Sequence, residues 1–245
     1  MSLRLSSGQR LHSPSGLLAR PTTGLVRQAV TNLLAAQLPG CRWLDLCSGS
    51  GAMACEALLH GAAWVEAVEK DARIAAVARR NLQGLGDRYS GRWALQVCSV
   101  ERWLSRSPQQ AFNLIYADPP YAAGVHAAIA AAVLRGGWLQ PDGQLLLECG
   151  KEAAPEPGIQ WRELKRRSYG RTLLLQWQPA GTDSAAQGAA AAVLVPSGNE
   201  QTHQGDGNQA QHDAAEQGFD HRPQSWKYIA SQSKGRHANL GGELS

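Results

Sequence analysis

Residues 43–54 read WLDLCSGSGAMA, an apolar run that enters a glycine-rich turn and leaves it as a helical stretch. A buried strand, a turn with glycines at positions 49 and 51, and a following helix are typical of the first βα unit of an open α/β sheet. Glycines in such a turn let the backbone approach a ligand closely, and these sheets bind ligands at the carboxyl ends of their strands. The stretch therefore predicts a parallel sheet with a ligand site just after residue 46.

Strand-like runs alternate with segments of helical period on both sides of this stretch. The expected strands are residues 43–46, 64–68, 93–98, 112–117 and 144–148, and the expected helices are 24–38, 52–60, 72–82 and 125–134. Two further strands, 161–165 and 172–177, are separated by a charged bend and predict an antiparallel pair. The alternation predicts an α/β fold with a mostly parallel seven-stranded sheet, helices on both faces, and an antiparallel C-terminal strand pair.

Composition divides the chain after residue 179. Residues 1–179 hold 20 basic and 13 acidic side chains, a net charge of +7, whereas residues 180–245 hold 4 and 7, a net charge of −3. The second part is rich in Gly and Gln and has few large apolar residues, so it cannot bury enough apolar surface to offset the entropy of ordering. We expect a folded domain over 1–179 and a disordered acidic tail over 180–245. The basic domain favours a polyanionic partner such as nucleic acid.

Several features indicate a cytoplasmic protein without a membrane or metal partner. The first ten residues contain no apolar signal segment, and the longest near-apolar run, 122–134, is too short to span a bilayer. The five cysteines form no C-x-x-C pair, and an odd number suits no disulfide framework. We therefore expect reduced cysteines, no zinc site and a monomeric chain.

Two acidic residues distinguish between the ligands that a glycine-rich turn can bind. The pattern G-x-G-x-x-A at 49–54 alone also fits a nicotinamide dinucleotide. Asp45, however, lies near the end of its strand, where a carboxylate would repel a pyrophosphate but can pair with the ammonium group of an amino acid. Glu69 ends the next strand and is placed to accept both hydroxyls of a ribose, while Asp71 is expected to cap the helix that begins at residue 72. Together these features describe S-adenosylmethionine better than NAD.

The most specific motif is residues 113–121, which read NLIYADPPY. Two consecutive prolines stiffen the turn and remove backbone donors, which leaves an acid, carbonyl oxygens and an aromatic ring at the end of a strand. Acceptors without donors suit an exocyclic amino group, whose lone pair is conjugated with a base until its N–H groups are held out of that conjugation. Asp118 and the carbonyl of Pro119 can hold them while Tyr121 stacks on the base, a contact worth roughly 1–3 kcal/mol.

These motifs together resemble a known family. The D-P-P-Y motif that follows a D-x-x-x-G-S-G turn is similar to amino-group methyltransferases, and the sequence RPTT at 20–23 before an amphipathic helix narrows the resemblance. Residues 1–179 resemble the bacterial 16S rRNA guanine-N2 methyltransferases of the guanine 966 type. The resemblance implies a Rossmann-like class I methyltransferase fold, S-adenosyl-L-methionine as cofactor, and 16S rRNA or the assembling small ribosomal subunit as partner.

The resemblance also implies roles for individual residues. Catalysis would rest on Asp118, Pro119, Pro120 and Tyr121. The expected cofactor residues lie after three strands: Asp45, Cys47, Ser48, Gly49, Ser50, Gly51, Glu69, Lys70 and Ser99. The expected substrate residues precede or belong to the first helix: Arg20, Pro21, Thr22, Thr23 and Asn32. Gly24 and Thr31 depart from the family pattern, which often has Asp and an aromatic residue at these positions.

The N-terminal arm is less basic than in many relatives, so RNA docking is expected to use other residues. The candidates surround the final bend: Arg162, Lys165, Arg166, Arg167 and Arg171. Three alternative functions stay open at this point. They are a DNA adenine-N6 methyltransferase, since the same motif accepts either amine, a non-catalytic rRNA-binding protein of the same fold, and an NAD-dependent oxidoreductase.

Overall fold

A computed structural model describes residues 3–14, 23–86, 89–119 and 124–181 of the chain. The predicted tail lies outside these residues except for positions 180 and 181, so its disorder stays a prediction. Five of the predicted site residues also lie outside the described residues, namely Arg20, Pro21, Thr22, Pro120 and Tyr121. No helix in the described part of the chain is long and apolar enough to cross a membrane.

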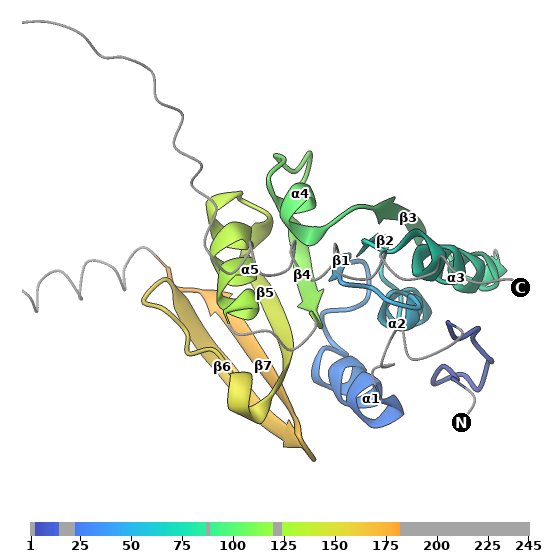
Figure 1. Cartoon of the computed structure of the whole chain (residues 1–245), viewed down its shortest axis with the longest axis horizontal. Helices are drawn as coiled ribbons and strands as arrows, with labels where there is room; N and C mark the ends of the chain where they lie inside the picture. The colour runs from blue at the N-terminus through green and yellow to red at the C-terminus, as the bar shows by residue number, and fades with distance from the viewer. Residues whose placement is uncertain (1–2, 15–22, 87–88, 120–123, 182–245) are drawn as a thin grey trace, which may run out of the picture.

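A single sheet of seven strands forms the centre of the fold, in the order β3-β2-β1-β4-β5-β7-β6 (Figure 1). Its strands are β1 (Arg42–Leu46), β2 (Trp64–Glu69), β3 (Arg92–Val97), β4 (Phe112–Ala117), β5 (Leu139–Gly150), β6 (Trp161–Tyr169) and β7 (Thr172–Pro179). Strands β1 to β5 pair in parallel, whereas β7 pairs antiparallel with both β5 and β6. The predicted sheet is confirmed. The strand order reverses between β1 and β4, which is where such sheets bind ligands.

Helices cover both faces of this sheet. They are α1 (Gly24–Leu33), α2 (Ala52–Leu59), α3 (Ala72–Gln83), α4 (Val100–Leu104) and α5 (Val125–Arg135), with a short 3-10 helix η2 (Lys151–Ala153) after β5. One buried cluster joins α1, α2 and the end of α3 to one face, and a second joins α4 and α5 to the other. Because side chains alternate along a strand, Trp43 faces the first cluster and Leu44 the second.

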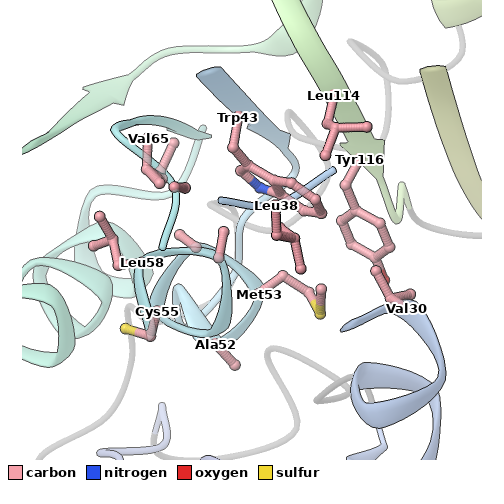
Figure 2. Close-up of a cluster of buried hydrophobic side chains, with 14 of the residues drawn as sticks. Val30, Leu38, Trp43, Ala52, Met53, Cys55, Leu58, Val65, Leu114 and Tyr116 are labelled. Carbon is pink, nitrogen blue, oxygen red and sulfur yellow. The ribbon is translucent and has the colours of Figure 1, made fainter. Parts of the chain in front are cut away.

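Large aromatic side chains fill the face that carries α1 and α2. The rings of Trp43 and Tyr116 stack with their centroids 6.1 Å apart and an angle of 21° between their planes. Figure 2 shows both side chains pointing from the sheet to the same side, toward Met53 of α2 and Val30 of α1. This packing fixes α2, and therefore the glycine-rich turn before it, against the ends of β1 and β4.

The N-terminal segment packs on the same face. Its backbone turns back at Gly8, so that Arg4 and Arg10 form an antiparallel bridge, and Leu3, Leu5 and Leu11 are buried. Glu56 of α2 anchors the turn through hydrogen bonds from the backbone N–H (2.9 Å) and the hydroxyl (2.7 Å) of Ser6. The Glu56 carboxylate is 2 % exposed and also lies 3.7 Å from Nε of Arg27.

The elements differ from the predicted ones mainly at their ends. Helix α1 ends at Leu33 rather than at residue 38, because the chain continues through turns that still bury Leu34 and Leu38. Helix α4 was not predicted, since five residues are too few to show a helical period. Strand β5 begins at Leu139 rather than at 144, although its first part contains Pro141 and Gly143, residues that usually indicate a turn.

Candidate functional site

The turn between β1 and α2 has an unusual backbone. Cys47 and Gly51 have positive φ angles of 62° and 76°, so the chain bends sharply at both ends of the turn. The Gly51 N–H donates to the Ser48 carbonyl at 2.9 Å, which closes the bend, and α2 begins at the next residue. A Cβ atom at Gly51 would lie 3.1 Å from Cβ of Ala78 in α3, so glycine also permits close packing here.

The carboxylate of Asp45 holds this turn from inside. It is 1 % exposed, and its Oδ2 accepts hydrogen bonds from the Ser48 hydroxyl and the Ala54 N–H, both at 3.0 Å. Burial raises the pKa of Asp45 to about 7, although these two hydrogen bonds favour the ionised form. The structure thus gives Asp45 a role in shaping the turn, and its pairing with a ligand's ammonium group stays a prediction.

Glu69 supports the turn from the neighbouring strand. Its Oε2 accepts from the Gly49 N–H and its Oε1 from the Asp71 N–H, both at 2.9 Å, and burial raises its pKa. Each carboxylate oxygen has a second lone pair, so both can still accept a ribose hydroxyl. Lys70 is exposed beside it, and Asp71 caps α3 as predicted, with hydrogen bonds from two N–H groups of the first turn.

Asp118 follows β4 directly, and β4 is the strand next to β1. Its side chain is half-buried and Pro119 is buried. The thiol of Cys47 reports how the acidic groups converge, because its pKa is raised well above the usual range by burial and then by the charges of Glu69, Asp118 and Asp45. Three acids at the carboxyl ends of neighbouring parallel strands therefore lie close enough to one thiol for their charges to act on it.

The remaining predicted residues have structural roles or lie elsewhere. Ser99 is the N-cap of α4 and accepts from the Arg102 N–H at 3.3 Å, and Thr23 is the N-cap of α1 and accepts from the Val26 N–H at 3.3 Å. Thr31 is buried, with its hydroxyl donating to the Gln28 carbonyl at 3.1 Å. Asn32 is exposed on α1, and among the described residues it lines a groove toward β6 that contains no residue of the glycine-rich turn.

Asn81 of α3 was missed by the sequence analysis. It is 2 % exposed, and its Nδ2 donates to the Ser50 carbonyl at 2.9 Å and to the His12 carbonyl at 3.0 Å. Its Oδ1 accepts from the His12 N–H at 2.8 Å. One side chain therefore joins the N-terminal segment to the glycine-rich turn. The available signal was an amide on the apolar face of α3, between Ala78 and Leu82.

A buried pair beneath Asp118 was also missed. The hydroxyl of Tyr116 donates to the carboxylate of Glu148, and both side chains are buried. His126 of α5 lies with Nε2 2.9 Å from the Glu148 carbonyl oxygen; a carbonyl only accepts, so Nε2 carries the proton. Burial lowers the pKa of His126, which keeps its ring neutral. These contacts join β4 and β5 at the edge where Asp118 emerges.

Comparisons with known proteins agree with this geometry. A family described as "Conserved hypothetical protein 95" matches residues 5–178. Ribosomal RNA small subunit methyltransferase D of Escherichia coli K12 is 28% identical over 141 residues, which cover 58% of this chain and 69% of that protein. The protein of the same name in Haemophilus influenzae is 25% identical over 151 residues, which cover 62% of this chain and 78% of that protein.

A solved structure shows the same fold. The Escherichia coli protein named "Putative methyltransferase yhhF" superposes with a TM-score of 0.65 at 24% identity, covering 73% of this chain and 98% of that one. The expected fold, a Rossmann-like class I methyltransferase fold with an antiparallel C-terminal strand pair, is therefore confirmed.

Replacement of Asp45 by Asn should change how stability depends on pH. The pKa of Asp45 rises from an ordinary 3.8 to about 7 on folding, so between these values the folded chain keeps a proton that the unfolded chain has lost. Stability therefore falls as the pH rises through this window, by roughly 4 kcal/mol for a shift of this size. The amide introduced by Asp45→Asn keeps an oxygen for Ser48 and Ala54 but has no charge to bury.

We expect urea denaturation at pH 5 and pH 8 to show a smaller loss of stability in Asp45→Asn than in the original chain. Burial also raises the pKa of Glu69, which is present in both proteins and gives both a loss of the same sign. Equal losses in the two proteins would show that Asp45 is not the buried group that titrates.

Removal of the Asn81 amide should destabilise the chain. Asn81→Ala would leave the carbonyls of Ser50 and His12 and one N–H group without their partner, and each buried group left unsatisfied costs about 1–3 kcal/mol. We expect a loss of roughly 3 kcal/mol in urea denaturation. Gln83→Ala removes an exposed amide from the same helix and is the matched control. Equal stabilities of the two variants would contradict the role given to Asn81.

Proposed function

The chain belongs to the conserved hypothetical protein 95 family, and we propose that it methylates the exocyclic N2 of a guanine in the 16S RNA of the small ribosomal subunit, with S-adenosylmethionine as methyl donor. Related proteins are named ribosomal RNA small subunit methyltransferases. The observation that carries the proposal is the position of Asp45, Glu69 and Asp118 at the carboxyl ends of the neighbouring parallel strands β2, β1 and β4, where the strand order reverses. The resemblance to the guanine 966 type indicates the target nucleotide.

The residues of the glycine-rich turn fit the proposed cofactor. S-adenosylmethionine, when bound, supplies a methyl group on a positively charged sulfur. Carboxylates at Asp45 and Glu69 favour a cationic ligand, whereas they would repel the pyrophosphate of NAD. The second lone pairs of Glu69 are suited to ribose hydroxyls, and the close packing at Gly51 holds the turn against α3. The predicted cofactor residues after β1 and β2, together with Ser99, are therefore proposed to form this site.

Asp118 and Pro119 are proposed to position the target amine. The Asp118 carboxylate would accept one N–H of guanine N2 and the Pro119 carbonyl another, which draws the nitrogen lone pair out of conjugation with the ring. The new N–C bond would form as the bond between the methyl carbon and the donor's sulfur breaks, which leaves a neutral thioether; the nitrogen would become positively charged and would then lose a proton. The Asp118 carboxylate is proposed to stabilise that charge and to receive the proton. The rate enhancement would come from orientation of the reactants and stabilisation of charge. The neighbouring Tyr116–Glu148 contact holds β4, the strand that Asp118 follows.

The target base must leave its stack to reach such a site, which favours an unpaired nucleotide. Tyr121 is proposed to stack on this base beside Pro120. Arg20, Pro21, Thr22 and Thr23 are proposed to contact the RNA just before α1. The monomeric state and the cytoplasm as the place of action are further parts of the proposal. So is the division into a catalytic domain over 1–179 and a tail over 180–245.

A methylation assay tests the function directly. The purified chain, supplied with S-adenosylmethionine labelled in its methyl group, should label small-subunit rRNA from cells that lack the enzyme, and nucleoside analysis should find N2-methylguanosine. A chain that ends at Gly181 should have the same activity if the tail is dispensable. Labelled N6-methyladenine in duplex DNA, with unlabelled rRNA, would overturn the proposal, and so would RNA binding without methyl transfer.

Asp118→Ala should abolish most of the methyl transfer while leaving cofactor binding nearly unchanged. Loss of one group that stabilises a transition-state charge typically lowers kcat by about 10²–10³-fold. Asp142→Asn is a matched control, because Asp142 is exposed in the first part of β5, at the opposite end of the parallel strands from Asp118. Single-turnover methylation gives the rate, and calorimetry gives the affinity for S-adenosylmethionine. Equal rates in the two variants would remove Asp118 from the catalytic role.

A further inference from the structure

A groove of about 410 Å³ runs between α1 and β6, apart from the acidic cluster. The residues that line it include Leu25, Asn32 and Leu33 of α1, and Lys165, Arg167 and Tyr169 of β6. Leu25 is 62% exposed, which is unusual for so large an apolar side chain. Among the described residues that line the groove, none is a carboxylate.

Strand alternation sorts the three consecutive cations of β6 between the two faces of the sheet. Lys165 pairs in register with Gln176 and Arg167 with Leu174, and Leu174 belongs to the cluster on the α1 face. Arg166 pairs with Leu175 of the opposite cluster. Side chains directly opposite each other in adjacent strands point to the same face, so Lys165 and Arg167 both face α1 while Arg166 faces away.

The cation that faces away is already neutralised. Nε of Arg166 donates to Glu163 at 2.9 Å, and its guanidinium also contacts Glu156 at 3.2 Å. Lys165 and Arg167 form no ion pair within the described part of the chain. Among the described residues, the groove therefore holds two positive charges that no carboxylate compensates.

Register also relates the groove to the proposed catalytic acid. Arg167 pairs with Leu174, and Leu174 pairs with Glu148 of β5. Glu148 follows Leu147, the partner of Ala117, so it shares a row with Asp118, the next residue after β4. Three strand spacings separate Asp118 from Arg167, about 14 Å in all. The groove and the acidic cluster thus lie along the same row across the strands. A few nucleotides of RNA could span the distance between them.

We propose that the groove between α1 and β6 binds unpaired nucleotides of the RNA next to the target guanine, an inference that rests on the proposed function. Lys165 and Arg167 bind two phosphates, Asn32 donates or accepts a hydrogen bond, and Leu25 and Tyr169 contact a base. Two cations beside an exposed leucine and a half-buried tyrosine match a single strand, in which anionic phosphates alternate with flat bases. Of the arginines and lysine proposed from sequence for RNA docking, this assigns the role to Lys165 and Arg167 rather than Arg166.

The test compares two double variants that each remove two positive charges. Lys165→Ala/Arg167→Ala removes the groove's cations, and Arg79→Ala/Arg80→Ala removes two exposed cations from α3, which covers the other end of the sheet (Figure 1). The probe is a labelled fragment of small-subunit rRNA that the original chain methylates. Loss of two phosphate contacts to a single strand should lower the slope of log affinity against log salt by about 1.4, which corresponds to roughly 25-fold weaker binding at 0.1 M salt.

Thermal unfolding and affinity for S-adenosylmethionine should stay unchanged in both variants, because all four side chains are exposed. A raised KM for RNA with an unchanged kcat, in the groove variant alone, supports the proposal. Equal RNA affinity and salt slope in the two variants would overturn the groove while leaving the proposed function intact. Absence of any methylation by the original chain would overturn the function and the groove together.

Asn32→Ala gives an independent measurement without a change of charge. It should raise KM for the RNA fragment while leaving the salt slope as in the original chain, because the contact it removes is not to a phosphate charge. An unchanged KM would exclude Asn32 from the groove's binding residues.

Discussion

A buried carboxylate at the end of β1 is the constraint on which this site depends. Asp45 is removed from water and accepts hydrogen bonds from Ser48 and Ala54, which lie on either side of the glycine-rich turn. A buried acid without such partners would be strongly unfavourable, so the turn must keep the shape that supplies them. The same two bonds place the first residues of α2, whose Met53 packs among Trp43 and Tyr116 (Figure 2). The shape of the glycine-rich turn and the packing of the hydrophobic core thus depend on each other.

The sheet carries acidic groups and basic groups in different places, and each suits a different part of the proposed reaction. Acidic groups meet near its centre, where β2, β1 and β4 end, and uncompensated cations lie toward the outer strand β6. A cationic methyl donor and a reacting amine are favoured at the centre, while the anionic backbone of a nucleic acid is favoured at the outside. Because Lys165 and Arg167 alternate with Arg166, the three-residue basic run serves two faces: Arg166 pairs with carboxylates, whereas the described lining of the groove on the α1 side contains none.

The sequence predicted the sheet and the acidic cluster well, since both follow from short-range patterns. Apolar runs alternate with helical segments, and Asp45, Glu69 and Asp118 each lie near the end of a strand, so parallel pairing alone brings them together. It could not predict Asn81 or the Tyr116–Glu148 pair, whose partners are distant in sequence and are chosen by tertiary packing. The family resemblance predicted Asn32 as a substrate residue, but its place in a groove beside β6 could not be predicted, because α1 meets β6 only in the folded chain.

The N-terminal segment has a consequence for the order in which the chain assembles. Ser6 bonds to Glu56 and His12 to Asn81, residues 50 and 69 positions further along the chain. Residues 6 and 12 therefore have no partners until α2 and α3 have been synthesised, so this segment cannot dock as soon as it is made. Because Asn81 joins His12 to Ser50, the N-terminal segment and the glycine-rich turn are connected only once both have packed against α3. During synthesis this connection would thus become possible once α3 has followed β2, while strands β3 to β7 are still to come.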